Sequence, residues 1–212
     1  MENVEKTIAK QLLGIKAVKL DVEHPFTWAS GWKSPIYCDN RKMLSYPSER
    51  KVVCNAFVKV IKDNFKDVDV IAGVATGAIA YGMMVAEALD KPFIYVRPKP
   101  KDHGTKSQIE GEIAKNQRVV VVEDLISTGQ SSLSATTALH QAGAIVLGMV
   151  AIFSYNFDTA RRSFEYADVE LHTLCQYDSL LEEAVVEKYI KKSDLDVLKQ
   201  WRISPSTWGT QK

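Results

Sequence analysis

The apolar positions near the amino terminus follow a helical period. Val4, Ile8 and Leu12 recur every four residues, which predicts an amphipathic helix that ends near Gly14. Proline suits the first turn of a helix, so a second helix is predicted to begin at Pro47. The inner face of this second helix would carry Val53, Phe57, Val60 and Ile61. Between the two helices, residues 16–20 alternate like a short strand.

From residue 68 onward, extended apolar runs alternate with helical patterns. Strands are predicted at 68–74, 93–97, 118–124 and 145–153, and the pattern at 169–174 is compatible with another strand. Helices are predicted at 78–89, 131–141, 156–167, 179–189 and 193–201. Strands that alternate with helices imply parallel pairing through right-handed crossovers. The predicted fold class is therefore α/β, with a mostly parallel central sheet flanked by helices.

One apolar run ends in two acidic residues. Four consecutive valines at 119–122 indicate a strand covered on both faces, which is typical of the centre of a parallel sheet. Glu123 and Asp124 follow at the carboxyl end of this strand, where open α/β sheets usually bind ligands. Ser127, Thr128 and Gly129 then lead into a helix whose first amides lack intrahelical partners, so they form a cradle for an anion.

This combination favours a phosphorylated ribose as the ligand. Adjacent carboxylates can hydrogen-bond a sugar diol or hold a hydrated magnesium ion, while the loop amides take a phosphate nearby. A Walker-type loop is excluded, because Gly129 is followed by Gln130 and Ser131 and no lysine. The alternative is a buried strand followed by an ordinary capped helix. The two acids argue against it, since ionised groups are seldom placed beside a core without a partner.

The segment resembles the phosphoribosyl-diphosphate-binding motif of the type I phosphoribosyltransferases. The resemblance implies that Glu123 and Asp124 bind the ribose hydroxyls and that the turn binds the 5′-phosphate. The residues that it assigns to phosphoribosyl diphosphate are Glu123, Asp124, Leu125, Ile126, Ser127, Thr128, Gly129, Gln130 and Ser131. A second small-residue turn at 75–77 also opens a helix, and it corresponds to the loop that takes the diphosphate in that family.

A basic stretch from Arg97 to Lys106 contains prolines and a glycine and is predicted to lack regular structure. A solvated loop is the ordinary interpretation, but the stretch follows a strand end and is the obvious positive patch for a polyanion. With its polar continuation to residue 112, it is predicted to form a mobile lid. It resembles the catalytic loop of orotate phosphoribosyltransferases through Arg97, Lys101 and His103. The resemblance implies that Arg97, Lys101 and His103 also bind phosphoribosyl diphosphate. It further implies catalytic roles for Lys101, His103 and Asp124, and a homodimer with shared active sites.

The stretch from Phe26 to Arg41 resembles the signature of the orotate-side hood in the same family. It supplies aromatic faces and exposed backbone, which suit a flat heterocycle. The resemblance implies that Phe26, Tyr37 and Ser127 bind orotate. Without it, the preferred interpretation of this stretch is a β-ribbon with aromatic packing.

Composition limits the remaining possibilities. At 212 residues the chain is expected to form a single domain, with a hood over about 1–45, a core over about 46–190 and a closing helix and tail at 191–212. A net charge of +1 favours neither nucleic acid nor a membrane surface as partner. The longest apolar run, 142–153, is shorter than the roughly 20 residues of a spanning helix. Three widely separated cysteines indicate reduced thiols and a cytoplasmic protein.

The expected function is transfer of phosphoribosyl from 5-phospho-α-D-ribose 1-diphosphate to orotate. The products are orotidine 5′-monophosphate and diphosphate, on the route to UMP. Magnesium is the expected cofactor, bound mainly through substrate and water rather than by a protein metal site. Two alternatives stay open: transfer to another base, and a non-enzymatic regulator that senses phosphoribosyl diphosphate. The regulator would need a basic face or an added nucleic-acid-binding module, which the near-neutral charge does not supply.

Overall fold

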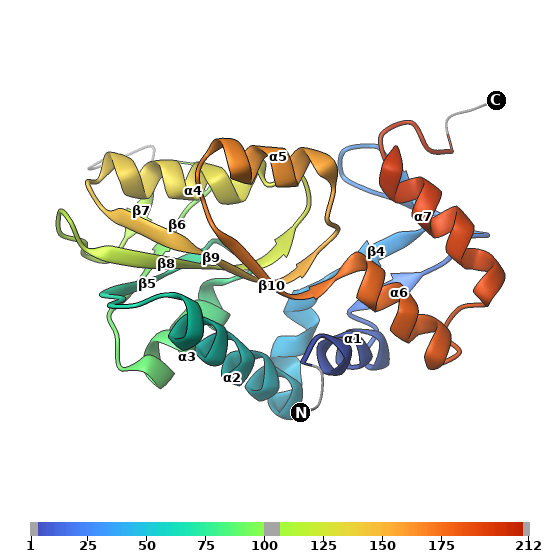
Figure 1. Cartoon of the computed structure of the whole chain (residues 1–212), viewed down its shortest axis with the longest axis horizontal. Coiled ribbons are helices and arrows are strands. Elements are labelled where there is room, and N and C mark those ends of the chain that lie inside the picture. Colours follow the sequence, from blue (N-terminus) through green and yellow to red (C-terminus); the bar gives the residue numbers. More distant parts are fainter. Residues whose placement is uncertain (1–3, 100–106, 210–212) are drawn as a thin grey trace.

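The computed structural model describes residues 4–99 and 107–209. Its centre is a six-stranded sheet with the order β10-β9-β8-β5-β6-β7 (Figure 1). The strands are β5 (Val70–Val74), β6 (Phe93–Val96), β7 (Ile109–Glu110), β8 (Arg118–Ile126), β9 (Ile145–Ser154) and β10 (Leu171–Gln176). All neighbouring pairs are parallel except β6 and β7. The predicted α/β class and the mostly parallel sheet are confirmed.

Helices cover both faces of the sheet. Figure 1 shows α4 (Gln130–Gln141) and α5 (Asp158–Tyr166) on one face, and α2 (Pro47–Asn64) and α3 (Ile79–Leu89) on the other, with α1 (Val4–Gly14) beside them. The valines of β8 alternate between these layers: Val119 and Val121 pack on the side of α4 and α5, and Val120 and Val122 on the other. This two-sided burial is why the strand is apolar without alternation.

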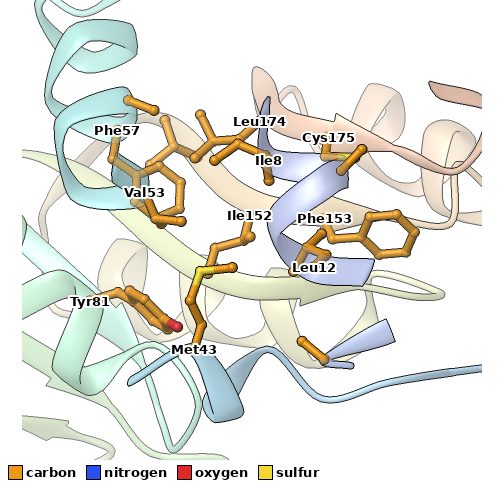
Figure 2. Close-up of a cluster of buried hydrophobic side chains, with 14 of the residues drawn as sticks. Ile8, Leu12, Met43, Val53, Phe57, Tyr81, Ile152, Phe153, Leu174 and Cys175 are labelled. Carbon is orange, nitrogen blue, oxygen red and sulfur yellow. The ribbon is translucent and has the colours of Figure 1, made fainter. Parts of the chain in front are cut away.

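The larger core joins the amino-terminal helices to the sheet. Figure 2 shows Ile8 and Leu12 of α1 and Phe57 of α2 in one cluster with Ile152 and Phe153 of β9. All five side chains are fully buried. Burial of each such side chain stabilises the fold by about 1.5–3 kcal/mol. The four-residue spacing of the apolar residues in α1 reflects the face of this helix that is buried against the sheet.

Residues 18–38 form two small antiparallel pairs beside the main sheet. Strand β1 (Val18–Leu20) pairs with β4 (Ile36–Cys38), and β2 (Phe26–Thr27) pairs with β3 (Lys33–Ser34). A 3-10 turn, η1 (Asn40–Ser45), then leads into α2. The short strand expected within 16–20 is confirmed, and the 26–41 stretch does contain a β-ribbon with aromatic packing.

The carboxyl-terminal elements include a helix that packs against this ribbon. They are α6 (Tyr177–Val186), η2 (Lys192–Asp194) and α7 (Leu195–Ile203). Trp201 of α7 is fully buried, and its ring centroid lies 5.5 Å from that of Trp28. The Trp201 indole donates a hydrogen bond to the Lys33 carbonyl at 3.3 Å. The predicted final helix therefore supports the base of the ribbon.

One part of the expected lid is regular structure. Ile109 and Glu110 form β7, which pairs antiparallel with Val96 and Tyr95 of β6. Gly111 follows with a φ of +103° and lies against Ile94, where a Cβ would come within 2.9 Å of its Cγ2. Residues 109–111 of the expected lid are therefore held against the edge of the sheet. The pairing depends on contacts with β6, which the polar sequence of this stretch does not indicate.

Within the described residues, no helix is long and apolar enough to cross a membrane. Cys54 and Cys175 are buried, Cys38 is partly exposed, and all three are free thiols.

Candidate functional site

Two loops meet where the direction of strand order changes. From β5 the chain proceeds outward to β6, whereas from β8 it proceeds the other way to β9 and β10, so β5 and β8 are neighbours at the switch. Ligands of open α/β sheets bind in the crevice at this position, outside the carboxyl ends of the strands. The loop 75–77 follows β5 and the turn 127–129 follows β8.

Glu123 is a buried support beneath this crevice. The residue is only 5% exposed. One carboxylate oxygen accepts from the Asp124 amide at 2.9 Å and the other accepts from the Ser132 hydroxyl at 2.9 Å. Glu123 thereby ties the end of β8 to the first turn of α4.

Asp124 points into space that Gly77 leaves open. A Cβ added at Gly77 would lie 2.3–2.6 Å from the three carboxylate atoms of Asp124, which is far below van der Waals contact. The glycine is therefore required by the carboxylate, and the two loops of the crevice meet at this contact. The sequence suggested only an anion-binding turn here.

A segment after β4 holds Asp124 from the other side. The Asn40 side chain, in a residue 1% exposed, donates to the Asp124 backbone carbonyl. Tyr81 in turn donates to the Asn40 carbonyl at 2.8 Å. Arg41 forms a two-point ion pair with Asp39, with distances of 2.7 and 3.0 Å. Its positive charge also acts on Asp124.

Burial raises the pKa of both acids. The pKa of Glu123 lies well above the ordinary value of 4.5, first because the group is desolvated and second because Asp124 is close. The pKa of Asp124 is also raised by burial, and the Arg41 charge acts in the opposite direction. Two neighbouring carboxylates in a partly closed crevice favour a ligand that brings hydroxyl donors or positive charge.

These shifts predict a pH-dependent stability. Because the folded state holds the Glu123 proton more tightly than the unfolded chain, the free energy of unfolding should fall as pH rises from about 4.5 through the folded-state pKa. Glu123→Gln should reduce this fall and raise Tm at pH 8, by about 3–6 °C for each ~1.4 kcal/mol of destabilisation removed. Thermal unfolding at pH 5 and pH 8 measures the effect. Glu182→Gln, on the exposed face of α6, is the matched control. An equal fall in all three proteins would contradict the prediction.

The turn after β8 forms an anion cradle. Gly129 caps α4 with a φ of 82°, and a Cβ there would come within 2.9 Å of the Phe164 ring. The N-cap residue Gly129 has no side chain to cap α4, so the first amides of this helix are available to an anion in the adjoining cavity. This cavity of about 290 Å³ is lined by Val74, Ala75, Thr76, Gly77, Glu123, Asp124, Leu125, Ser127, Thr128, Gly129 and Ser131.

A second cavity of about 630 Å³ opens beside the first, toward the β2–β3 ribbon. It is lined by Thr27, Trp28, Ala29, Ser30, Trp32, Tyr37, Cys38, Leu125, Ser127, Thr128, Gln130 and Tyr155. Leu125, Ser127 and Thr128 belong to both cavities, so the two spaces meet at the turn after β8. Aromatic walls on this side suit a flat ring.

The aromatic wall is held by ring contacts. Trp28 stacks on Trp32 with 6.3 Å between ring centroids and contacts Tyr155 at 5.1 Å. The Trp28 indole donates to the Ile36 carbonyl at 3.0 Å, which ties the ribbon to β4. Phe26, which was expected to bind orotate, does not line this cavity, and its ring centroid lies 5.8 Å from that of Tyr37.

The structure thus brings most of the expected site residues together. Ile126 is fully buried and contributes no side chain to either cavity. Arg97 lies after β6, 3.7 Å from Glu110, and does not line the crevice. Lys101 and His103 lie outside the described residues. Sequence reasoning did not single out the structural roles of Gly77, Asn40, Trp28, Trp32 and Tyr155.

The acids fit a weakly protein-bound magnesium ion. Among the described residues, no three His, Cys, Asp or Glu side chains are grouped as metal ligands. Both Glu123 oxygens already accept hydrogen bonds, which leaves Asp124 as the carboxylate that faces the cavity. Magnesium is commonly held by one or two carboxylates together with substrate phosphates and water, and this donor set allows that arrangement.

Comparisons of the sequence and of the structure with known proteins point to the same family. A family model described as "Phosphoribosyl transferase domain" matches residues 39–190. The chain is 53% identical to an orotate phosphoribosyltransferase of Porphyromonas gingivalis, with 99% of this chain and 100% of that protein covered. A solved orotate phosphoribosyltransferase of Aeropyrum pernix matches with a TM-score of 0.74 and 32% identity, over 83% of this chain and 97% of that one. Leishmania donovani UMP synthase matches with a TM-score of 0.77 and 28% identity, over 93% of this chain and 42% of that one.

Proposed function

The chain belongs to the orotate phosphoribosyltransferases, within the phosphoribosyltransferase family, and we propose that its two joined cavities divide the two substrates between them. The smaller cavity takes 5-phospho-α-D-ribose 1-diphosphate and the larger takes orotate. The reaction gives orotidine 5′-monophosphate, the precursor of UMP, and diphosphate. The observation that carries this division is the wall of Leu125, Ser127 and Thr128 that both cavities share. The base nitrogen and the sugar carbon would meet there.

On the sugar side, each polar group has a separate part. Asp124 accepts hydrogen bonds from the ribose hydroxyls, and Glu123 supports it through the Asp124 amide. The amides and hydroxyls from Ser127 to Ser131 bind the 5′-phosphate. The loop 75–77 lies on the far side of Asp124 and faces the diphosphate. The sugar is thereby held between its two anionic ends.

On the base side, Trp28, Trp32 and Tyr37 provide ring faces. Ser127 contacts both substrates, because it lies on the shared wall. Phe26 acts by holding the Tyr37 ring. This arrangement favours orotate bound in line with the sugar carbon, and such positioning is a main source of rate in reactions of two substrates.

Departure of the diphosphate needs positive charge. Arg97, Lys101 and His103 of the loop after β6 supply it, and we place them in the site of a second subunit, so that the active unit is a homodimer with shared sites. Magnesium, bound mainly to substrate oxygens and water, would add charge to the same leaving group. Arg97 is paired with Glu110 in the single chain, which is consistent with a role away from its own crevice.

Substrate choice is the direct test. With phosphoribosyl diphosphate and magnesium, orotate absorbance should fall, whereas adenine, guanine and uracil should give no reaction. The assay should include phosphoribosyl diphosphate alone to measure hydrolysis. Turnover of a purine with orotate inert would instead support transfer to another base. Binding of phosphoribosyl diphosphate without turnover of any base would support a regulator.

A further inference from the structure

The proposed substrate of the larger cavity carries a charge that its lining does not match. Orotate has a ring carboxylate, and an anion that leaves water for a partly apolar cavity needs a cation or several hydrogen-bond donors. Within residues 4–99 and 107–209, the lining of this cavity contains no lysine, arginine or histidine. A cation adjacent to the lining is therefore the group to seek.

Lys33 is such a cation. Its ammonium group lies 2.8 Å from the hydroxyl oxygen of Thr27, and Thr27 lines the cavity. The two residues face each other across the β2–β3 ribbon, so the contact is fixed by strand register. Lys33 therefore places a positive charge next to a residue that lines the cavity proposed for orotate.

Two of the other described cations near this region, those of Arg41 and Lys42, are already engaged. Arg41 forms its two-point ion pair with Asp39. Lys42 donates to the carbonyls of Ile15 and Lys16. Lys33, in contrast, has no carboxylate partner among the described residues, and its ammonium contacts only a neutral hydroxyl. Its charge is thus available to an anionic ligand.

The rest of Lys33 is held in place. Its carbonyl accepts from the buried Trp201 indole at 3.3 Å. Gly209 lies against its aliphatic stem, where a Cβ on that glycine would be 3.4 Å from the Lys33 Cβ. A lysine fixed at its backbone and stem loses less conformational freedom on binding a ligand than a free surface lysine does.

We propose that Lys33, together with Thr27, determines the specificity of the larger cavity for an anionic base. The Thr27 oxygen accepts from the Lys33 ammonium, so the Thr27 hydroxyl hydrogen is free to donate to the orotate carboxylate. The lysine polarises this donor and supplies the opposite charge. The inference rests on the proposed function, because it concerns the substrate of that same site.

The test compares charge removal on the protein with charge removal on the ligand. Lys33→Met keeps most of the aliphatic stem and should raise the KM for orotate and its dissociation constant about tenfold or more, with the KM for phosphoribosyl diphosphate unchanged. Lys33→Arg should restore most of the affinity. The 6-carboxamide of uracil, a neutral analogue of orotate, should bind Lys33→Met as it binds wild type. Lys66→Met, which removes an exposed lysine after α2, is the control for net charge.

Each failure has a distinct result. If wild type does not use orotate at all, the proposed function is wrong. If wild type is active and Lys33→Met keeps the wild-type orotate KM, the role of Lys33 is wrong and the function stands. If orotate and its neutral analogue lose affinity equally, Lys33 supports the shape of the ribbon and does not recognise charge. Circular dichroism and Tm show whether the variant is folded.

Discussion

Asp124→Asn is expected to abolish most activity while the fold is preserved. Asparagine has the volume of aspartate, so it fits the space beside Gly77, and the contacts of the Asp124 backbone with Asn40 and Glu123 remain. What is lost is the charge that accepts hydrogen bonds from the ribose. A charged hydrogen bond left unmade costs about 1.5–3 kcal/mol, so phosphoribosyl diphosphate should bind roughly 10- to 150-fold more weakly.

Calorimetry with phosphoribosyl diphosphate and magnesium measures this loss, and steady-state assays measure the accompanying fall in kcat/KM. Asp90→Asn is the matched control, because Asp90 caps α3 in a left-handed conformation that asparagine also adopts. Affinity and rate that stay at wild-type values in Asp124→Asn would place the sugar elsewhere in the molecule.

Mixing two inactive variants should restore activity. Lys101→Ala alone should lower the maximal rate far more than it weakens substrate binding, because the leaving group needs positive charge mainly as its bond breaks. Lys101 lies outside the described residues, but the chain on either side is anchored: the Arg97 amide donates to the Gln108 carbonyl at 2.8 Å. If the loop serves the neighbouring subunit, a heterodimer of Lys101→Ala and Asp124→Asn has one site with both defects and one site with neither.

With equal mixing and free exchange, half of the dimers are mixed, so activity should approach a quarter of the wild-type value. Native mass spectrometry is needed to establish that subunits have exchanged. Wild type mixed with Asp124→Asn is the control for dilution. Confirmed exchange with activity no higher than that of the separate variants would mean that the loop acts within its own chain.

The periodicity of apolar residues predicted most of the fold, because the buried face of each helix or strand determines which of its positions are apolar. The unbroken valines of β8 predicted a strand covered on both faces, and the spacing of Ile8 and Leu12 predicted the buried face of α1. The ends of elements were less exact. Strand β8 continues through Leu125 and Ile126, and β10 begins and ends two residues later than expected, since neighbouring strands decide where pairing stops.

The parts that sequence did not indicate depend on distant contacts. Strand β7 has two residues and forms only because β6 offers an edge. A glycine at position 77 could be required either by the backbone conformation of a turn or by a side chain packed against it. Only the position of the Asp124 carboxylate shows that the second reason applies. The acids and the turn of the sugar side are local in sequence, whereas the base side needs Trp28 and Tyr155, which lie far apart in sequence. The motif that is continuous was therefore the easier one to predict.

The contact between Trp28 and Trp201 has a consequence for folding of the nascent chain. The hydrogen bond from Trp201 to Lys33 spans 168 residues, so the ribbon stays without this support until α7 has been translated. The loops that line the smaller cavity lie between residues 74 and 131 and leave the ribosome much earlier. The base side can therefore become complete only after α7 has emerged, whereas the segments of the sugar side are available for pairing earlier.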